Sequence, residues 1–156
     1  MQLPPFAQQQ TDVSTMPNFT ISGLNRFPVK GLSAEPLDTL TLTEGEGVPG
    51  DRLFGFARYN SVFDPTNPEP LPKERFVVLV KEAALAGLNT TFDDTTWTLQ
   101  IATGDSTHSF EMDSAEVRAE AGVFLHKTLG LSDPEPPFSS PLHRTGLQMS
   151  RLYHHK

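Results

Sequence analysis

The prolines of this 156-residue chain limit its fold more than any other feature, because most of the 14 gather in three places. They are dense near the N-terminus, between residues 65 and 72, and between residues 134 and 141, where regular strands and helices are hard to continue. The sequence therefore predicts a flexible N-terminal arm over 1–17, an ordered domain over 18–131, and a Pro-rich extended tail over 132–156. The stretch from Asp64 to Lys73 is interpreted as a long exposed loop.

Alternating apolar and polar residues predict strands through most of the ordered domain. We expect a short strand ending before Phe27-Pro28 and others over 38–43, 52–59 and 76–80, the last followed by a short helix over 82–89, and a hairpin of 97–101 with 108–112. Residues at helical spacing from Val117 to Leu129 predict a helix that Asp113 caps and Gly130 ends. The expected fold class is α/β, a small, mostly antiparallel β-barrel with a C-terminal packing helix and flexible tails.

Charge and composition exclude several classes of partner and of chemistry. The chain has 12 Lys and Arg against 19 Asp and Glu, a formal net charge of -7, which argues against nucleic acid or an anionic membrane as the main partner. There is no cysteine, so disulfides, thiolate metal ligands and thiol nucleophiles are excluded. The absence of a long apolar run or a signal-like start leads us to expect a cytoplasmic protein.

Two basic residues stand in backbone settings suited to an anion. Lys30 follows a predicted strand end in Pro-Val-Lys-Gly, and Arg52 follows a loop that carries Gly45, Gly47 and Gly50. A guanidinium offers a planar fork and an ammonium a mobile point charge, so the two could share one phosphate. From spacing alone, exposed or ion-paired surface residues remain the simpler interpretation.

Other candidates are weaker. His108 alternates with apolar strand residues and His126 has no ligand partner at helical spacing, while His143, His154 and His155 are in the predicted tail. Asp93-Asp94 and Glu44-Glu46 lie beside Thr or Gly, where acids solvate and cap turns. We expect these acids to be structural.

The ordered motifs of the chain resemble a known family. The segments LNRFPVKGLS (24–33) and LTLTEGEGVPGDR (40–52), followed by PKERF (72–76), LAGL (85–88), TLQI (98–101) and a helix ending at Leu131, come in the order and at the intervals of one domain type. This is the N-terminal β-barrel domain that precedes a MOSC domain, the C-terminal domain of molybdenum cofactor sulfurase. Such domains occur in YcbX-type proteins and in the mitochondrial amidoxime-reducing component.

The resemblance implies a function. Its members bind a molybdenum cofactor between this domain and the MOSC domain and reduce N-hydroxylated compounds. By resemblance, Lys30 and Arg52 hold the pterin phosphate or its neighbourhood. Gly31 stands where some relatives have a serine, and Ser33 is nearby. The implied partners are a C-terminal MOSC domain or a partner chain, and an electron-donor protein.

One departure from the family bears on catalysis. In the family, a cysteine of the MOSC domain holds the molybdenum, and this sequence contains no cysteine. We therefore expect either a partial or truncated chain of a longer oxidoreductase or a stand-alone barrel that has lost the chemistry. The alternative function is a non-catalytic β-barrel interaction module. A nucleic-acid-binding barrel is less supported, because core packing explains aromatic residues such as Phe54 and Phe56.

Overall fold

The computed structural model describes residues 19–61 and 71–141. Its elements are β1 (Leu24–Arg26), β2 (Val29–Lys30), β3 (Glu35–Leu37), β4 (Phe54–Ala57), the 3-10 helices η2 (Lys73–Arg75) and η3 (Ala83–Gly87), β5 (Leu88–Asp93), β6 (Thr98–Thr103), β7 (Ser106–Glu111), α1 (Ala115–Leu129) and β8 (Phe138–Pro141). The arm expected over 1–17, most of the expected loop from Asp64 and the tail beyond residue 141 lie outside the described residues. No helix within the described ranges is long and apolar enough to cross a membrane.

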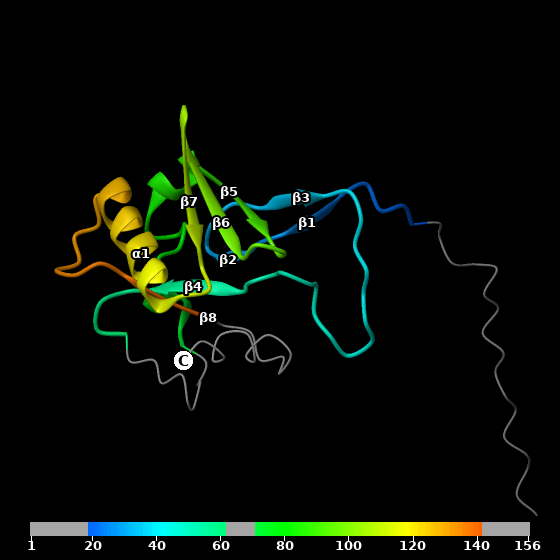
Figure 1. The fold of residues 1–156 in the computed structure, drawn as a ribbon, viewed down its shortest axis with the longest axis horizontal. Coiled ribbons are helices and arrows are strands. Elements are labelled where there is room, and N and C mark those ends of the chain that lie inside the picture. The colour runs from blue at the N-terminus through cyan, green and yellow to red at the C-terminus, as the bar shows by residue number, and fades with distance from the viewer. Residues whose placement is uncertain (1–18, 62–70, 142–156) are drawn as a thin grey trace, which may run out of the picture.

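The strands form three small sheets, in the orders β1-β3, β2-β4-β8 and β5-β6-β7. Only β2 and β4 pair in parallel, so the expectation of mostly antiparallel pairing with one C-terminal packing helix is confirmed for the described residues. The expected barrel is not formed there, because no hydrogen-bonded ladder joins one sheet to the next. In Figure 1 the β1-β3 ribbon extends away from α1.

The predicted hairpin is confirmed as β6 and β7, which pair from Thr98↔Glu111 to Thr103↔Ser106. A third strand was missed. β5 pairs with β6 along its whole length, although the helix-forming residues before it predicted a helix through residue 89. The helical part is only η3, and the alternating burial of β5 shows why a strand follows, since every second side chain enters the core.

The predicted C-terminal helix is confirmed as α1, with one correction at its start. Ser114, not Asp113, is the N-cap, and its hydroxyl accepts a hydrogen bond from the Val117 N–H. Gly130 ends the helix in the left-handed conformation, as expected. The helix lies very close to the segment before β8, since a Cβ at Gly122 would come within 2.0 Å of the Pro137 carbonyl oxygen. Glycine at this position allows the two backbones to approach.

Two predicted strands are wrong in position. The ladder partner of β1 is Glu35–Leu37, whereas residues 38–43 form no strand, although they alternate cleanly. Phe76 makes only a single bridge to Ala57. The chain then turns, with the Lys81 N–H bonded to the Val78 carbonyl, and this turn leaves Leu79 and Val80 exposed.

The fold continues beyond the boundary expected at Leu131. β8 adds to β4 as an antiparallel strand, and the preceding loop is fixed by Asp133, which forms a salt bridge with Arg58. Its prolines had suggested an extended tail, but a strand at the edge of a sheet tolerates proline, as β8 does.

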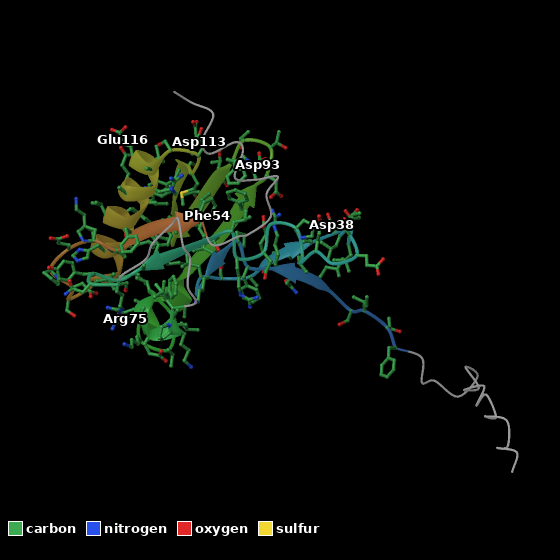
Figure 2. The ribbon with its side chains drawn as sticks, turned by 90° about the horizontal axis from the view of Figure 1, so that it is seen from below. Asp38, Phe54, Arg75, Asp93, Asp113 and Glu116 are labelled. Carbon is green, nitrogen blue, oxygen red and sulfur yellow. The ribbon has the colours of Figure 1, made fainter. Side chains whose placement is uncertain are left out.

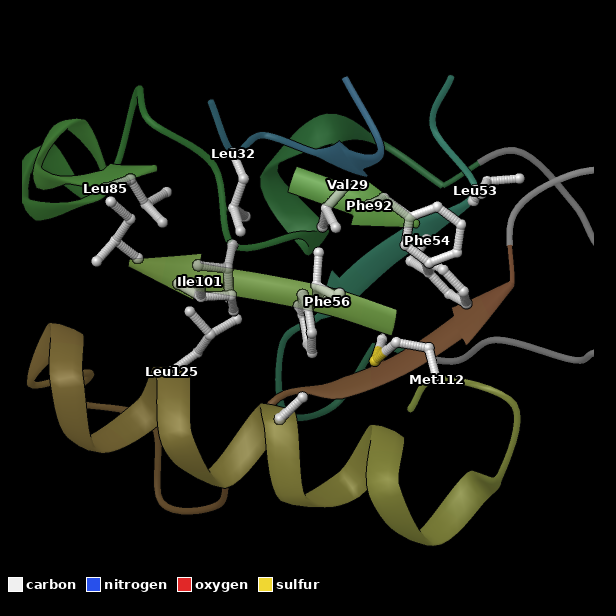
Figure 3. Close-up of a cluster of buried hydrophobic side chains, with 14 of the residues drawn as sticks. Val29, Leu32, Leu53, Phe54, Phe56, Leu85, Phe92, Ile101, Met112 and Leu125 are labelled. Atoms are coloured by element: carbon white, nitrogen blue, oxygen red, sulfur yellow. The ribbon is translucent and has the colours of Figure 1, made fainter. Parts of the chain in front are cut away.

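The core lies between the sheets and α1. Phe56 of β4, Ile101 of β6 and Leu125 of α1 are fully buried and meet there, as Figure 3 shows. Three aromatic rings close one end of this core: Phe54, Phe92 and Trp97 meet edge to face with ring centroids 5.7–6.0 Å apart. β4, which was expected to be covered on both faces, is buried along its whole length.

Candidate functional site

The pairing of β2 with β4 places Lys30 and Arg52 on adjacent segments of the chain. The two strands run in parallel with Val29 opposite Phe54, and Arg52 lies just before β4. The Arg52 N–H donates to the Phe27 carbonyl at 2.6 Å, which ties the end of the glycine-rich loop to the start of β2. The charge of Arg52 is close enough to act on Lys30. Two residues separated by a long loop in the sequence therefore lie within electrostatic range of each other.

Lys30 is a cation with little to balance it. Its Nζ lies 3.7 Å from the centroid of the Phe76 ring, a cation–π contact. Burial lowers the pKa of Lys30, the positive charge of Arg52 lowers it further, and the charge of Glu74 opposes both. Among the salt bridges of the described residues, none involves Lys30.

Arg52 is held at its backbone and exposed at its tip. Its side chain is 64% exposed and its Nη1 lies 3.0 Å from an oxygen of Asp51. The other oxygen of Asp51 accepts the Phe27 N–H at 2.7 Å, so that carboxylate is anchored to the backbone. Because an exposed pair of this kind contributes little free energy, the guanidinium is available to an incoming anion. Beside Lys30, it can form the second arm of a phosphate clamp.

The two neighbours of Lys30 that the resemblance implied have structural roles. Gly31 has φ +90°, and a Cβ there would lie 2.7 Å from the Val77 carbonyl oxygen, so this backbone favours glycine over the serine of some relatives. The Ser33 hydroxyl accepts the Thr90 N–H at 2.7 Å and lies 2.9 Å from the Thr90 hydroxyl. Its hydrogen bonds therefore join the loop after β2 to β5.

A second charged cluster was missed from the sequence. Arg26 is only 6% exposed and donates to Glu35 at 2.7 Å, to Asp94 at 2.5 Å and to the Phe92 carbonyl at 2.6 Å. Burial alone would lower the pKa of Arg26, but the hydrogen bonds and charges of the two carboxylates outweigh it and raise the pKa. Two of the three partners lie more than 60 residues away in the sequence, so no local pattern could reveal them.

The remaining sequence candidates within 19–61 and 71–141 supply no catalytic set, and His143, His154 and His155 lie outside the described residues. The ring of His108 packs against Phe124 with centroids 4.4 Å apart, and the His126 Nε2 lies 2.9 Å from the Asp133 carbonyl oxygen. Asp93 accepts the N–H groups of the two threonines that follow Asp94, which lowers the pKa of Asp93 and confirms its turn-capping role. In the part of the chain that the structure describes, no three His, Cys, Asp or Glu side chains are grouped to hold a metal.

The described residues therefore offer two cations within electrostatic range of each other and no group of three potential metal ligands. Comparison of the chain with protein-family models, with curated proteins and with solved structures finds no match.

Proposed function

We propose that this chain is the cofactor- and substrate-facing N-terminal domain of a MOSC-type molybdenum-cofactor oxidoreductase that acts on N-hydroxylated compounds. The observation that supports the proposal is that Lys30, at the end of β2, and Arg52, just before β4, lie within electrostatic range of each other. In this role the two cations hold the phosphate of the pterin. The cofactor, when bound, supplies the two-electron reduction of the substrate.

The surroundings of the two cations fit a phosphate. An anion placed between Lys30 and Arg52 removes their mutual repulsion and stabilises the charged form of Lys30, whose pKa is lowered in the free protein. The ammonium contributes a point charge above the Phe76 ring, and the guanidinium contributes two parallel donors. Their backbones are held by the sheet, so little ordering is needed on binding.

The metal end of the cofactor would be held elsewhere. The sequence contains no cysteine, and the described residues hold no group of potential metal ligands. In this proposal, two domains or two chains each bind one end of the cofactor. This chain binds the phosphate and shields that end of the pterin, while the MOSC domain or a partner chain provides the thiolate ligand.

The experiment is a calorimetric titration of the chain with a pterin alcohol and with its phosphate monoester. We expect the monoester to bind and the alcohol to bind much more weakly. Replacing Lys30 and Arg52 by Ala together should weaken the monoester by about tenfold to a hundredfold, since charge-assisted hydrogen bonds are lost. Lys127→Ala, which removes one exposed charge from α1, is the matched control and should bind as the wild type does.

Three results would contradict this proposal. Equal affinity for alcohol and monoester would remove the phosphate role. An unchanged affinity in the Lys30→Ala/Arg52→Ala variant would remove these two residues. Binding of phenyl phosphate as tight as that of the pterin ester would leave an anion site but refute the pterin.

One observation favours the second candidate, a non-catalytic interaction module. Phe19, Ile21 and Leu42, in the segments that flank the β1-β3 ribbon, are 89%, 79% and 65% exposed. Large apolar side chains this accessible are typical of surfaces that a partner covers. Sedimentation of the wild type against a Phe19→Ser/Ile21→Ser/Leu42→Ser variant tests self-association: a dimer lost in the variant supports the module, and a monomer in both counts against pairing of two copies.

A further inference from the structure

The described residues enclose an open hollow of about 430 Å³ on the side of β4 where the chain leaves that strand. Three cations line it: Arg58, Arg75 and Lys81. Two acids, Glu74 and Asp133, also reach it, and Tyr59 and Ser61 complete the lining. Among the lining residues the cations outnumber the acids by three to two, and Glu82, which pairs with Arg58, adds a third acid next to the hollow.

The floor of the hollow is fixed by Arg58. Its guanidinium forms salt bridges with Glu82 and with Asp133, and the side chain is only 15% exposed. The two carboxylates more than offset its single positive charge and hold it in place. They leave its Nε–H buried without an acceptor, so this N–H can still donate a hydrogen bond to an oxygen within reach.

Arg75 and Lys81 are the two exposed cations of the hollow, and Glu74 is an exposed acid beside them. Neither cation forms a salt bridge among the residues described. Hydrogen bonds hold both backbones. The Arg75 carbonyl accepts the Arg58 N–H at 2.8 Å and the Ser61 hydroxyl at 2.9 Å, and the Lys81 N–H donates to the Val78 carbonyl at 3.0 Å. Figure 2 shows Arg75 at the periphery of the domain, apart from Phe54 in its middle.

We propose that this hollow is a second ligand site, which takes a small organic oxyanion through Arg75 and Lys81. The anionic group, a phosphate or a carboxylate, is held between the guanidinium of Arg75 and the ammonium of Lys81. The volume of about 430 Å³ exceeds what a bare anion fills and matches a small-molecule pocket. Tyr59, which is 37% exposed, offers an aromatic surface for the rest of the molecule, so a planar ring suits the site.

This site is separate from the Lys30–Arg52 clamp, since neither of those residues lines the hollow. Glu74 stands between the two regions: it lines the hollow and its charge also acts on Lys30. The inference therefore does not rest on the proposed function. It would stand if the clamp bound no pterin, and it would fail without affecting the clamp.

The test follows backbone amide NMR signals of the wild-type chain during titration with phenyl phosphate, benzoate and benzyl alcohol. The first two carry the two kinds of oxyanion on the same ring, and the third carries none. We expect saturable shifts at Tyr59, Arg75 and Lys81 with at least one of the anions at physiological ionic strength, and none with the alcohol. The anion that binds more tightly identifies the source of the oxyanion.

Variants assign the effect to the hollow. Arg75→Ala and Lys81→Ala should each weaken binding by about tenfold, because each removes a charge-assisted hydrogen bond. Both side chains are exposed, so the variants should keep the wild-type melting temperature. A Lys73→Ala/Lys127→Ala variant changes the net charge as much as an Arg75→Ala/Lys81→Ala variant does, and it should bind normally, as should Lys30→Ala/Arg52→Ala.

Several results would overturn the inference. Shifts that do not saturate, or that benzyl alcohol reproduces, would show no oxyanion site. Shifts confined to residues around Lys30 and Arg52 would assign all anion binding to the clamp. Equal weakening in Lys73→Ala/Lys127→Ala would reduce the effect to net charge.

Discussion

Arg26 and Lys30 lie four residues apart in the consecutive strands β1 and β2. Their surroundings shift the pKa of the two side chains in opposite directions. Arg26 is buried against two carboxylates and a carbonyl, which raise its pKa. Lys30 is partly buried beside another cation and above an aromatic ring, and its pKa is lowered. Removing one partner of a buried ion pair destabilises the fold, because the other charge is then buried without a partner. A cation that has no paired carboxylate can still bind an anion. The comparison separates a structural cation from a binding cation.

The largest effect on stability should come from removing the paired cation, Arg26. Arg26→Met leaves the 13%-exposed Glu35 side chain without its cation and the Phe92 carbonyl without its donor. We expect a loss of about 3 kcal/mol in the free energy of unfolding, measured with urea. Asp94→Asn is the graded control, because the Asp94 side chain is 54% exposed and should cost about 1 kcal/mol or less. If Arg26→Met were as stable as wild type, the network would not be structural.

A smaller loss is expected at the backbone beside Lys30. Gly31→Ala places a Cβ 2.7 Å from the Val77 carbonyl oxygen at φ +90°, and should destabilise the fold by about 2 kcal/mol. Gly104→Ala separates the two causes, since Gly104 also has positive φ but its Cβ would meet nothing within 4 Å. We expect the loss at Gly104 to be about 1 kcal/mol. Equal losses in thermal unfolding would mean that the contact with Val77 adds nothing.

The smallest effects concern the titration of Lys30 itself. Arg52→Ala removes a repelling charge and should raise the pKa of Lys30, whereas Glu74→Gln removes an attracting one and should lower it further. Both are measured from the NMR signals of the Lys30 ε-methylene group. Because the folded pKa lies below the unfolded value of 10.5, the unfolded chain binds more protons between the two values, so stability from this group rises with pH across that window. Shifts of the same sign in both variants would contradict the assignment.

The elements that could be predicted from the sequence are those whose pattern is local. The β6-β7 hairpin and α1 follow from side-chain periodicity over one segment, and their bounds are close to the expected ones. β5 was missed because the residues before it favour a helix, and β8 because its prolines suggested a tail. In both cases pairing with a strand already in place overrides the local preference.

The charged sites also differ in whether a local sequence pattern reveals them. Lys30 and Arg52 share a ligand by the resemblance, whereas their spacing alone favoured a surface role, and the structure places them within electrostatic range of each other. The Arg26 network and the hollow depend on contacts such as Arg58 with Asp133, 75 residues apart. Periodicity carries no information about such pairs, since they form only when separate sheets meet.

The most direct test of the account measures the pKa of Lys30 with and without inorganic phosphate, in the wild type and in Arg52→Ala. Phosphate bound between the two cations favours the charged ammonium, so the account predicts that saturating phosphate raises the pKa of Lys30 in the wild type, and raises it less in the variant, where half of the clamp is missing. A Lys30 pKa that phosphate leaves unchanged in the wild type would contradict the central claim that these two residues form an anion site.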